Sequence, residues 1–304
     1  SYFSLIINQI SHSARLKAIR AFLILISNDM KFRLFIAGLM VSFTVSAQSI
    51  ERIEPPNWWA GMKNESVQVM FYGPNISQYK INIQSASIKL NGTTALPNPN
   101  YLLVDFDLTN LVEAEKLKIT FFNNNDRFVM YYDFLERRKG SSKRYGVTTQ
   151  DLIYLIMPDR FSNGDPTNDV VEGMNEATLN RDSMYYRHGG DLKGIQNHLD
   201  YFNDLGVTAL WLNPILENNQ PKASYHGYAI TNHYKVDPRF GTNELFKNFV
   251  DSCHQNDIKV IQDVVYNHTG NEHWFIKDMP YKQWVHNLDT FGRTTYRATT
   301  LFDP

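Results

Sequence analysis

The hydrophobic pattern of this chain changes its period once, near the basic residues at 137–140, and that change predicts two domains. Before it, from about residue 50, apolar residues come in short alternating or continuous runs that end at Gly, Pro or Asn, which is typical of β-strands. The clearest runs are 67–71, 104–108 and 117–121. Because no helical spacing separates them, residues 48–138 are predicted to form a small antiparallel β-sandwich of the immunoglobulin type.

After this basic stretch, the pattern alternates between strands and helices. Apolar strands are expected at 152–157, 207–212 and 258–265, and helices at 192–205 and 243–256. Such alternation indicates an α/β fold with a parallel sheet covered on both faces. An open doubly wound sheet fits this pattern, and so does the first part of a (β/α)8 TIM barrel, which needs about 250 residues when complete. On the barrel interpretation, residues 145–268 hold the first three β/α units.

The amino-terminal segment has the features of an export signal. Two basic residues precede an apolar run at 34–45, and small residues follow it. Residues 30–47 are therefore predicted to be a signal peptide, with the exported protein, periplasmic or secreted, beginning near Gln48. A membrane anchor is the alternative, although the run is shorter than the roughly 20 residues of a spanning helix. Residues 1–29 precede a better start at Met30 and are predicted to be upstream sequence foreign to the native protein.

Charge and cysteine content exclude several classes of protein. The formal net charge is -1, with both signs scattered along the chain, so neither a nucleic acid nor, after signal cleavage, a membrane surface is expected as a partner. The one cysteine, Cys253, has no CxxC or His-rich neighbourhood and is predicted to pack in a helix. The sequence contains no P-loop, Rossmann glycine fingerprint, G-x-S-x-G elbow or HExxH zinc motif.

Polar clusters follow each of the three predicted strands of the α/β region, where parallel α/β folds place their active sites. The first cluster lies at 159–169 and is rich in oxygen ligands, with Asn163, Asp165, Asn168 and Asp169. Carboxylate and amide oxygens in this number suit Ca²⁺, which takes six to eight oxygen ligands. A solvated turn is the alternative, because Asn, Asp, Gly and Pro are also the usual turn residues.

The second and third clusters combine aromatic rings with hydrogen-bonding groups. Tyr225, His226 and Tyr228 surround a glycine after the second strand, and Asp263 and His268 lie where the third strand ends. Sugar rings offer apolar faces to aromatic side chains and hydroxyls to directional partners, so both clusters suit a carbohydrate. Ordinary packing of the aromatic rings, a satisfied core aspartate and a capping histidine are the alternatives.

These clusters resemble the motifs of one known family. Residues 263–268 match the D-x-x-x-N-H motif at the third barrel strand of the α-amylase superfamily, a group of family 13 type glycoside hydrolases. Residues 225–228 followed by 236–242 are similar to that family's segment between its second and third strands. Residues 53–62 resemble the N-terminal domain of cyclomaltodextrinases and neopullulanases. The resemblance covers nearly everything from Gln48 onward.

The resemblance implies roles for particular side chains. Tyr228 would stack on the sugar of the innermost subsite, His268 would bind its hydroxyls, and Asp263 would support that site. Tyr225 and His226 would be neighbours of the same subsite. The calcium ligands that the resemblance implies are Asn163, Asp165, Asn168, Asp169, Gly189 and Asp191.

The implied activity is retaining hydrolysis of α-glucosidic bonds in maltodextrins, cyclodextrins, pullulan or starch. This mechanism needs a carboxylate nucleophile and a carboxylic acid about 5 Å apart, and in the family both lie on later barrel strands. Residues 269–304 correspond to the start of the inserted domain B, so no catalytic residue is assigned within this chain, which is expected to be inactive alone. One departure from the family is visible at 231–234, Thr-Asn-His-Tyr, where relatives commonly have an aspartate before the aromatic residues.

Two other classes of function stay open. One is a non-catalytic α-glucan-binding protein on the same scaffold, for which Trp58 and Trp59 could provide a sugar platform or could pack against the barrel. The other is a structural or transport-associated relative that has lost the catalytic acids. A homodimer formed through the N-terminal domain is an alternative to a monomer.

Overall fold

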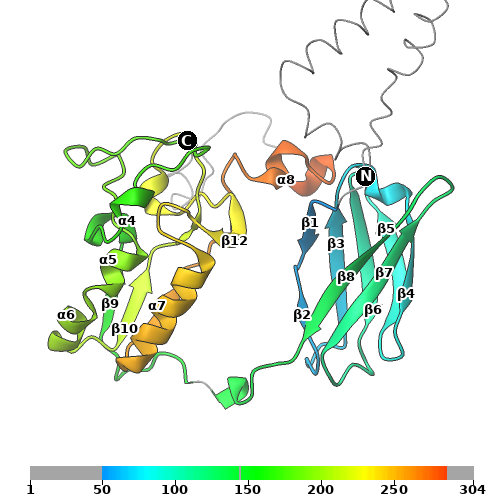
Figure 1. Cartoon of the computed structure of the whole chain (residues 1–304), viewed down its shortest axis with the longest axis horizontal. Helices are drawn as coiled ribbons and strands as arrows, with labels where there is room; N and C mark the ends of the chain where they lie inside the picture. The colour runs from blue at the N-terminus through cyan, green and yellow to red at the C-terminus, as the bar shows by residue number, and fades with distance from the viewer. Residues whose placement is uncertain (1–49, 144, 286–304) are drawn as a thin grey trace, which may run out of the picture. The chain divides into compact units, whose positions relative to one another are not determined.

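The computed structural model describes residues 50–143 and 145–285 (Figure 1). The predicted upstream segment, the predicted signal peptide and the last part of the predicted inserted domain lie outside these residues. Within the described ranges, no helix has the length and apolar content needed to cross a bilayer.

The first described region contains two four-stranded sheets. One has the order β1-β3-β6-β5, and all its neighbouring strands are antiparallel. The other has the order β2-β8-β7-β4, in which the two-residue β2 runs parallel to β8 and the remaining pairs are antiparallel. In chain order the strands are β1 Arg52–Glu54, β2 Trp58–Trp59, β3 Ser66–Tyr72, β4 Lys80–Gln84, β5 Lys89–Ala95, β6 Tyr101–Asp107, β7 Glu115–Phe122 and β8 Arg127–Leu135.

The core of this region lies between the two sheets. On β8, Tyr132 and Phe134 are buried while their neighbours along the strand are exposed, which is the two-residue period of a strand with one face on a core. Phe71 of β3 and Phe121 of β7 meet edge to face across the sheets, with ring centroids 5.3 Å apart. The β-sandwich predicted from the short apolar runs is confirmed.

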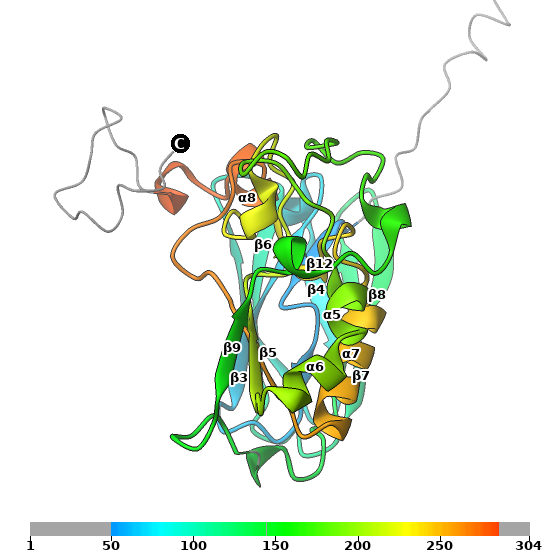
Figure 2. The same ribbon diagram turned by 90° about the vertical axis from the view of Figure 1, so that its left-hand side faces the viewer.

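The second region is built on a three-stranded parallel sheet with the order β13-β10-β9. Figure 2 shows helices α5, α6 and α7 on one side of this sheet. Leu210 and Leu212 of the sheet share a buried cluster with Phe202 and Phe249 of the helices. The elements are β9 Ile153–Ile156, α5 Leu192–Gln196, α6 Leu199–Asp204, β10 Ala209–Leu212, α7 Asn243–Gln255 and β13 Lys259–Gln262.

The other face of this sheet has no helix against it among the described residues. Ile153, Leu155 and Trp211 are exposed there, so the expectation of a sheet covered on both faces is wrong for this part of the chain. Helices on one face only are the arrangement of a barrel, whose helices form an outer ring, whereas a doubly wound sheet has helices on both faces. The sheet is therefore the first part of a (β/α)8 barrel.

The helix predicted over 192–205 is interrupted, with α5 and α6 separated by two residues. In a continuous helix the backbone N–H of His198 would donate to the carbonyl of Gly194. Here the ring Nδ1 of His198 donates a hydrogen bond to the carbonyl of Gly194 at 2.7 Å. The backbone N–H of His198 donates to the carbonyl of Ile195 at 3.0 Å instead. A local side-chain bond of this kind competes with the helical ladder, and it divides the helix in two.

Helix α7 follows its prediction closely. Thr242 caps its amino end by accepting a hydrogen bond from the backbone N–H of Leu245 at 3.1 Å. Phe249 and Cys253 lie on its buried face. Burial raises the pKa of the Cys253 thiol to about 12, so this cysteine is an unreactive packing residue, as its sequence context predicted.

Shorter elements connect these parts. Helix α4 Pro158–Phe161 follows β9, the hairpin of β11 Leu216–Glu217 and β12 Asn232–Val236 lies between β10 and α7, and α8 Trp274–Lys277 comes after β13. The 3-10 turns are η1 Ile76–Gln78, η2 Ser141–Lys143, η3 Pro166–Asn168, η4 Ser224–His226 and η5 Lys282–Trp284.

The segment after α8 is tied to the β-sandwich by one carboxylate. Asp278 accepts hydrogen bonds from Tyr72 Oη and Asn100 Nδ2, at 2.9 and 2.8 Å, and from Asn98 Nδ2. These three donors hold the pKa of Asp278 below its usual value, although its burial acts in the opposite direction. The ring of Trp274 stacks on the ring of Tyr101, with centroids 5.9 Å apart.

Candidate functional site

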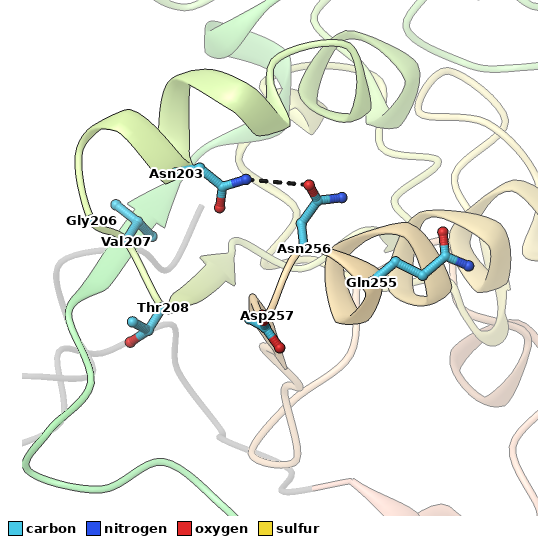
Figure 3. A pocket seen from close by; sticks show the side chains of 7 residues that line it. All are labelled: Asn203, Gly206, Val207, Thr208, Gln255, Asn256 and Asp257. Atoms are coloured by element: carbon cyan, nitrogen blue, oxygen red, sulfur yellow. Dashed lines mark hydrogen bonds between the residues drawn. The ribbon is translucent and has the colours of Figure 1, made fainter.

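The polar clusters predicted from the sequence lie after the carboxyl ends of β9, β10 and β13. In parallel α/β folds these ends share one edge of the sheet, and substrates bind there. A cavity of about 480 Å³ lies elsewhere: Val207 and Thr208, which line it, precede β10, and Asp257 precedes β13 (Figure 3). Because these residues belong to the amino ends of the strands, we assign that cavity to the face where barrels carry stability rather than chemistry.

The structure brings four of the five predicted sugar-site residues into direct contact. Tyr228 Oη donates to Asp263 Oδ2 at 2.9 Å, and Nε2 of His268 lies 2.9 Å from the backbone oxygen of Tyr228. His226 Nδ1 accepts from the backbone N–H of Tyr228 at 2.9 Å, and the two rings are stacked. Tyr225 lies beside them, with its ring 5.6 Å from that of His226 and under the guanidinium of Arg160.

Tyr228 is both exposed and fixed in place. Its side chain is held at the hydroxyl by Asp263, yet 38% of the residue is exposed. Burial of the hydroxyl end, followed by its hydrogen bond to Asp263, raises the pKa of Tyr228 to about 12, so the hydroxyl remains a donor at ordinary pH. A ring that is orientated in this way presents a rigid apolar face to a ligand.

The hydrogen bonds of His226 and His268 show which ring nitrogen donates and which accepts. Burial lowers the pKa of His226, and because Nδ1 of its neutral ring accepts from Tyr228, its Nε2–H is the available donor. His268 has Nε2 on the Tyr228 carbonyl and Nδ1 3.2 Å from Asn267 Nδ2. A sugar hydroxyl would therefore have to replace one of the present partners of His268.

Gly227 shapes the loop that carries these rings. Its φ is +83°, and a Cβ at this position would lie 2.1 Å from the backbone oxygen of Pro214. Only glycine combines a left-handed conformation with so close an approach to another backbone. The position of Tyr228 thus depends on Gly227.

The loop after β9 has the character of a cation site. Asn163 Nδ2 donates to Asp169 Oδ1 at 2.7 Å, while the amide oxygens of Asn163 and Asn168 are buried without a hydrogen-bond partner. Gly189, with a φ of +82°, passes so close that a Cβ would lie 2.4 Å from Asp169 Oδ1. Burial, assisted by the charge of Asp191, raises the pKa of Asp169. Unsatisfied buried oxygens beside such a carboxylate are what an oxygen-liganded cation would satisfy.

Like Asp169, two more of the six predicted ligands accept hydrogen bonds from the protein itself. Asp165 Oδ1 accepts from the backbone and hydroxyl of Thr167. Asp191 accepts from the backbone N–H groups of Gly164, Asp165 and Gly194, and so caps α5. Within the described ranges no group of three or more His, Cys, Asp or Glu side chains could hold a metal ion, so the candidate shell depends on amide oxygens.

A buried ion pair supports the segment behind the sugar-site cluster. Asp237 and Arg239 are both almost fully buried. Arg239 donates two hydrogen bonds to the carboxylate of Asp237, from Nε at 2.9 Å and from Nη2 at 2.8 Å. Arg239 also donates to the backbone oxygens of Glu176 and Asn218. Burial alone would raise the pKa of Asp237, but the hydrogen bonds and charge of Arg239 hold it below its usual value.

Comparison with known proteins relates the β-sandwich and the α/β region each to a known family. Residues 155–296 match the family Alpha amylase, catalytic domain, and residues 52–138 match the family Cyclomaltodextrinase, N-terminal. The chain is thus similar to the α-amylase family over residues 155–296. Its resemblance to that family and to the cyclomaltodextrinase N-terminal domain, predicted from its motifs, is confirmed.

Several curated members of the α-amylase family are similar to this chain. Neopullulanase 2 of Thermoactinomyces vulgaris is 38% identical over 167 residues, which are 50% of this chain and 27% of that protein. The cyclomaltodextrinase of Thermoanaerobacter pseudethanolicus is 40% identical over 134 residues, 43% of this chain and 22% of that protein. The periplasmic α-amylase of Escherichia coli is 37% identical over 129 residues, 39% and 19% of the two chains. The chain thus spans about a quarter of the first two relatives.

Two residues of the candidate site were not predicted from the sequence. Trp211 of β10 donates from Nε1 to Asp263 Oδ2 at 3.3 Å, and its place in an apolar strand concealed it. Asp159 is almost fully buried and accepts from the backbone N–H of His188 at 2.9 Å, beside the cation loop. A polar residue close to the carboxyl end of a strand is the signal that pointed to Asp263, and Asp159, three residues after the end of β9, carries a similar signal.

Proposed function

We propose that this chain is part of a glycoside hydrolase that cleaves α-glucosidic bonds in maltodextrins, cyclodextrins, pullulan or starch with retention of configuration. The observation that supports this most directly is the exposed ring of Tyr228, fixed by Asp263 beyond the carboxyl end of β13. The match to the α-amylase catalytic domain and the names of the relatives support the same assignment. The nucleophile and the acid are proposed to lie on barrel strands outside this sequence.

The residues of the chain would bind and orient the substrate. Tyr228 would stack against a glucose ring, because 38% of the residue is exposed while its hydroxyl is held. Asp263 would keep that ring in position, with support from Trp211. His226 would donate from Nε2 to a sugar hydroxyl, and His268 would bind another. These contacts hold a glycosidic bond in one place relative to the carboxylates, which is the positioning part of catalysis.

Tyr228→Ala is expected to lower kcat/KM for the glucan in the full-length protein. Removing a stacked aromatic side chain costs about 1.5–3 kcal/mol, which corresponds to roughly 10- to 150-fold in rate. The measurement is release of reducing ends from cyclodextrin, pullulan and starch. Tyr145→Ala, at a tyrosine that is 91% exposed, is the control and should leave kcat/KM unchanged.

Two outcomes of this assay contradict the proposal. If the two variants cleave glucans equally well, Tyr228 does not bind the substrate. If the wild-type protein binds glucans but cleaves none of the three, it is instead a non-catalytic glucan-binding protein on the same scaffold.

We propose that Ca²⁺ occupies the loop after β9. Asn163 Oδ1, Asn168 Oδ1 and Asp169 would coordinate it directly, and Gly189 would contribute its carbonyl oxygen. Asp165 and Asp191 would shape the loop through their backbone hydrogen bonds and could add ligands. The buried, unpartnered amide oxygens support this assignment. The ion would hold the loop in its folded conformation, and no reaction step passes through it.

Removal of Ca²⁺ with EDTA is expected to lower the Tm of the full-length protein. Binding at a hundred times Kd contributes about 2.7 kcal/mol, and Mg²⁺ should replace it poorly because its shell is smaller and strictly octahedral. Differential scanning calorimetry with Ca²⁺, Mg²⁺ or EDTA measures the difference. Asn163→Ala should abolish the Ca²⁺ effect, whereas Asn203→Ala, at the other edge of the sheet, should retain it. Equal Tm values in Ca²⁺ and EDTA would show that the loop needs no ion.

We also propose that the protein is exported, and that its N-terminal domain takes part in a homodimer. The similarity to a periplasmic α-amylase supports export. A glucan is the expected partner, and neither a nucleic acid nor a membrane is. Sequencing the amino terminus of the exported protein, which should begin near Gln48, tests the first statement, and its mass in solution tests the second.

A further inference from the structure

Two histidines from separate elements face each other beside the candidate site. His233 belongs to β12, and His273 is the residue before α8. Nδ1 of His233 lies 3.3 Å from Nε2 of His273, and the ring centroids are 5.3 Å apart. His273 is only 2% exposed. Neither histidine belongs to the motifs that carry the resemblance, at 53–62, 225–228, 236–242 and 263–268.

The hydrogen bonds around the pair have one consistent direction. The backbone N–H of Phe275 donates to Nδ1 of His273 at 3.1 Å and caps α8. The proton of a neutral His273 is therefore on Nε2, which points at Nδ1 of His233. His233 Nδ1 must then accept, so the proton of His233 is on Nε2. His233 also makes a hydrogen bond with the backbone of Val265, and we assign it to Nε2–H because Nδ1 accepts from His273.

This series of bonds reaches the proposed sugar site. Val265 is two residues after Asp263 and three before His268. Its side chain is buried with Leu216 and Ile230 in a small cluster. The two rings thus join the start of α8 to the backbone between the two polar residues that follow β13.

The surroundings favour uncharged rings. Burial lowers the pKa of His273 to about 4, with smaller effects of His233 and of Arg52. Burial likewise lowers the pKa of His233. Arg52 of β1 lies over the neighbouring Trp274 ring, with 5.2 Å between its Cζ and the ring centroid.

The acidic groups nearby have partners of their own. On the segment of His273, Glu272 is paired with Lys277, and Asp278 is held by the donors of the sandwich. Among the interactions of the described residues, no carboxylate is paired with either ring. Protonation of the pair therefore has no compensating partner there.

We propose that His233 and His273 are positioning residues: as a neutral hydrogen-bonded pair they hold the backbone after β13, and with it Asp263 and His268, and acidification releases this backbone. Protonated Nδ1 of His273 could no longer accept from Phe275, and protonated Nδ1 of His233 would oppose the N–H of His273. Both pKa values are lowered in the fold, so the stabilisation is complete above about pH 6.5, the value of an unperturbed histidine. It is lost as the pH falls from there toward about 4.

Hydrogen exchange tests the pair without any assay of glucan cleavage. In the full-length protein, backbone exchange of peptides covering 263–281, corrected for the intrinsic pH dependence, is expected to rise at least threefold between pH 7.5 and pH 5. His273→Asn keeps an acceptor for the Phe275 N–H but cannot become charged, so its rise should be smaller. His254→Asn, at an exposed histidine near the end of α7, is the matched control and should behave as wild type. An equal rise in all three proteins overturns the proposal.

The pH profile of kcat/KM for the glucan adds a second readout, which rests on the proposed function. His273→Asn is expected to move the acid limb by at least half a pH unit toward lower pH, whereas His273→Ala, which removes the acceptor, should raise KM more than it lowers kcat. An acid limb identical in wild type and His273→Asn contradicts a positioning role. Absence of glucan cleavage, together with the predicted exchange, contradicts the proposed function and leaves the histidine pair in place.

Discussion

Asp237→Ala is expected to lower the free energy of unfolding by about 3–5 kcal/mol, because it leaves a buried guanidinium without its counter-charge. Arg239 is 1% exposed and donates to both carboxylate oxygens of Asp237. The same arginine donates to the backbones of Glu176 and Asn218, so three segments should loosen together. Urea denaturation of the full-length protein, followed by circular dichroism, measures the loss.

The matched control for Asp237→Ala is an ion pair whose lysine is exposed. Lys235 pairs with Glu217 at 2.8 Å, and its side chain is 53% exposed. Lys235→Ala should therefore cost less than about 1 kcal/mol. If Asp237→Ala and Lys235→Ala prove equally mild, water must reach Arg239 and the pair is not buried as described.

Gly227→Ala is expected to lower kcat/KM for the glucan by about 100-fold, because displacing a substrate-positioning group by 1 Å can have an effect of that size. The added Cβ would lie 2.1 Å from the oxygen of Pro214, in a backbone with a φ of +83°. The loop must move, and Tyr228 and His226 move with it. Steady-state kinetics on cyclodextrin and pullulan measure the loss.

Gly146→Ala is the control for this substitution, since a Cβ at Gly146 would meet nothing within 4 Å. It should retain wild-type kcat/KM. Unchanged kinetics in Gly227→Ala would mean that the loop accommodates the methyl group and that the ring of Tyr228 does not depend on this glycine.

Local sequence patterns predicted much of this fold because local physics determines them. The alternation at 67–71 and 117–121 predicted β3 and β7, and the helical pattern at 243–256 predicted α7. The order β1-β3-β6-β5 could not be predicted, because strand pairing depends on contacts between residues far apart in the chain. The break between α5 and α6 was missed because it depends on one bond between the His198 ring and a backbone oxygen.

In the candidate site, too, features set by local sequence were predicted and contacts between distant residues were missed. Motif spacing pointed to Tyr228, Asp263 and His268, and the structure brings them together. Trp211 was missed because an apolar strand gives no sign of which side chain will meet an acid 52 residues later. The histidines at 233 and 273 were missed as a pair for the same reason, since 40 residues separate them.

The carboxylate of Asp278 has a consequence for how such proteins can exchange domains. Its donors, Tyr72, Asn98 and Asn100, all belong to the β-sandwich, so the acceptor and its donors are encoded in distant parts of the gene. A recombination event that replaced the sandwich alone would leave Asp278 without these donors. Chimeras that carry all four residues together should therefore express and fold more readily than chimeras that split them.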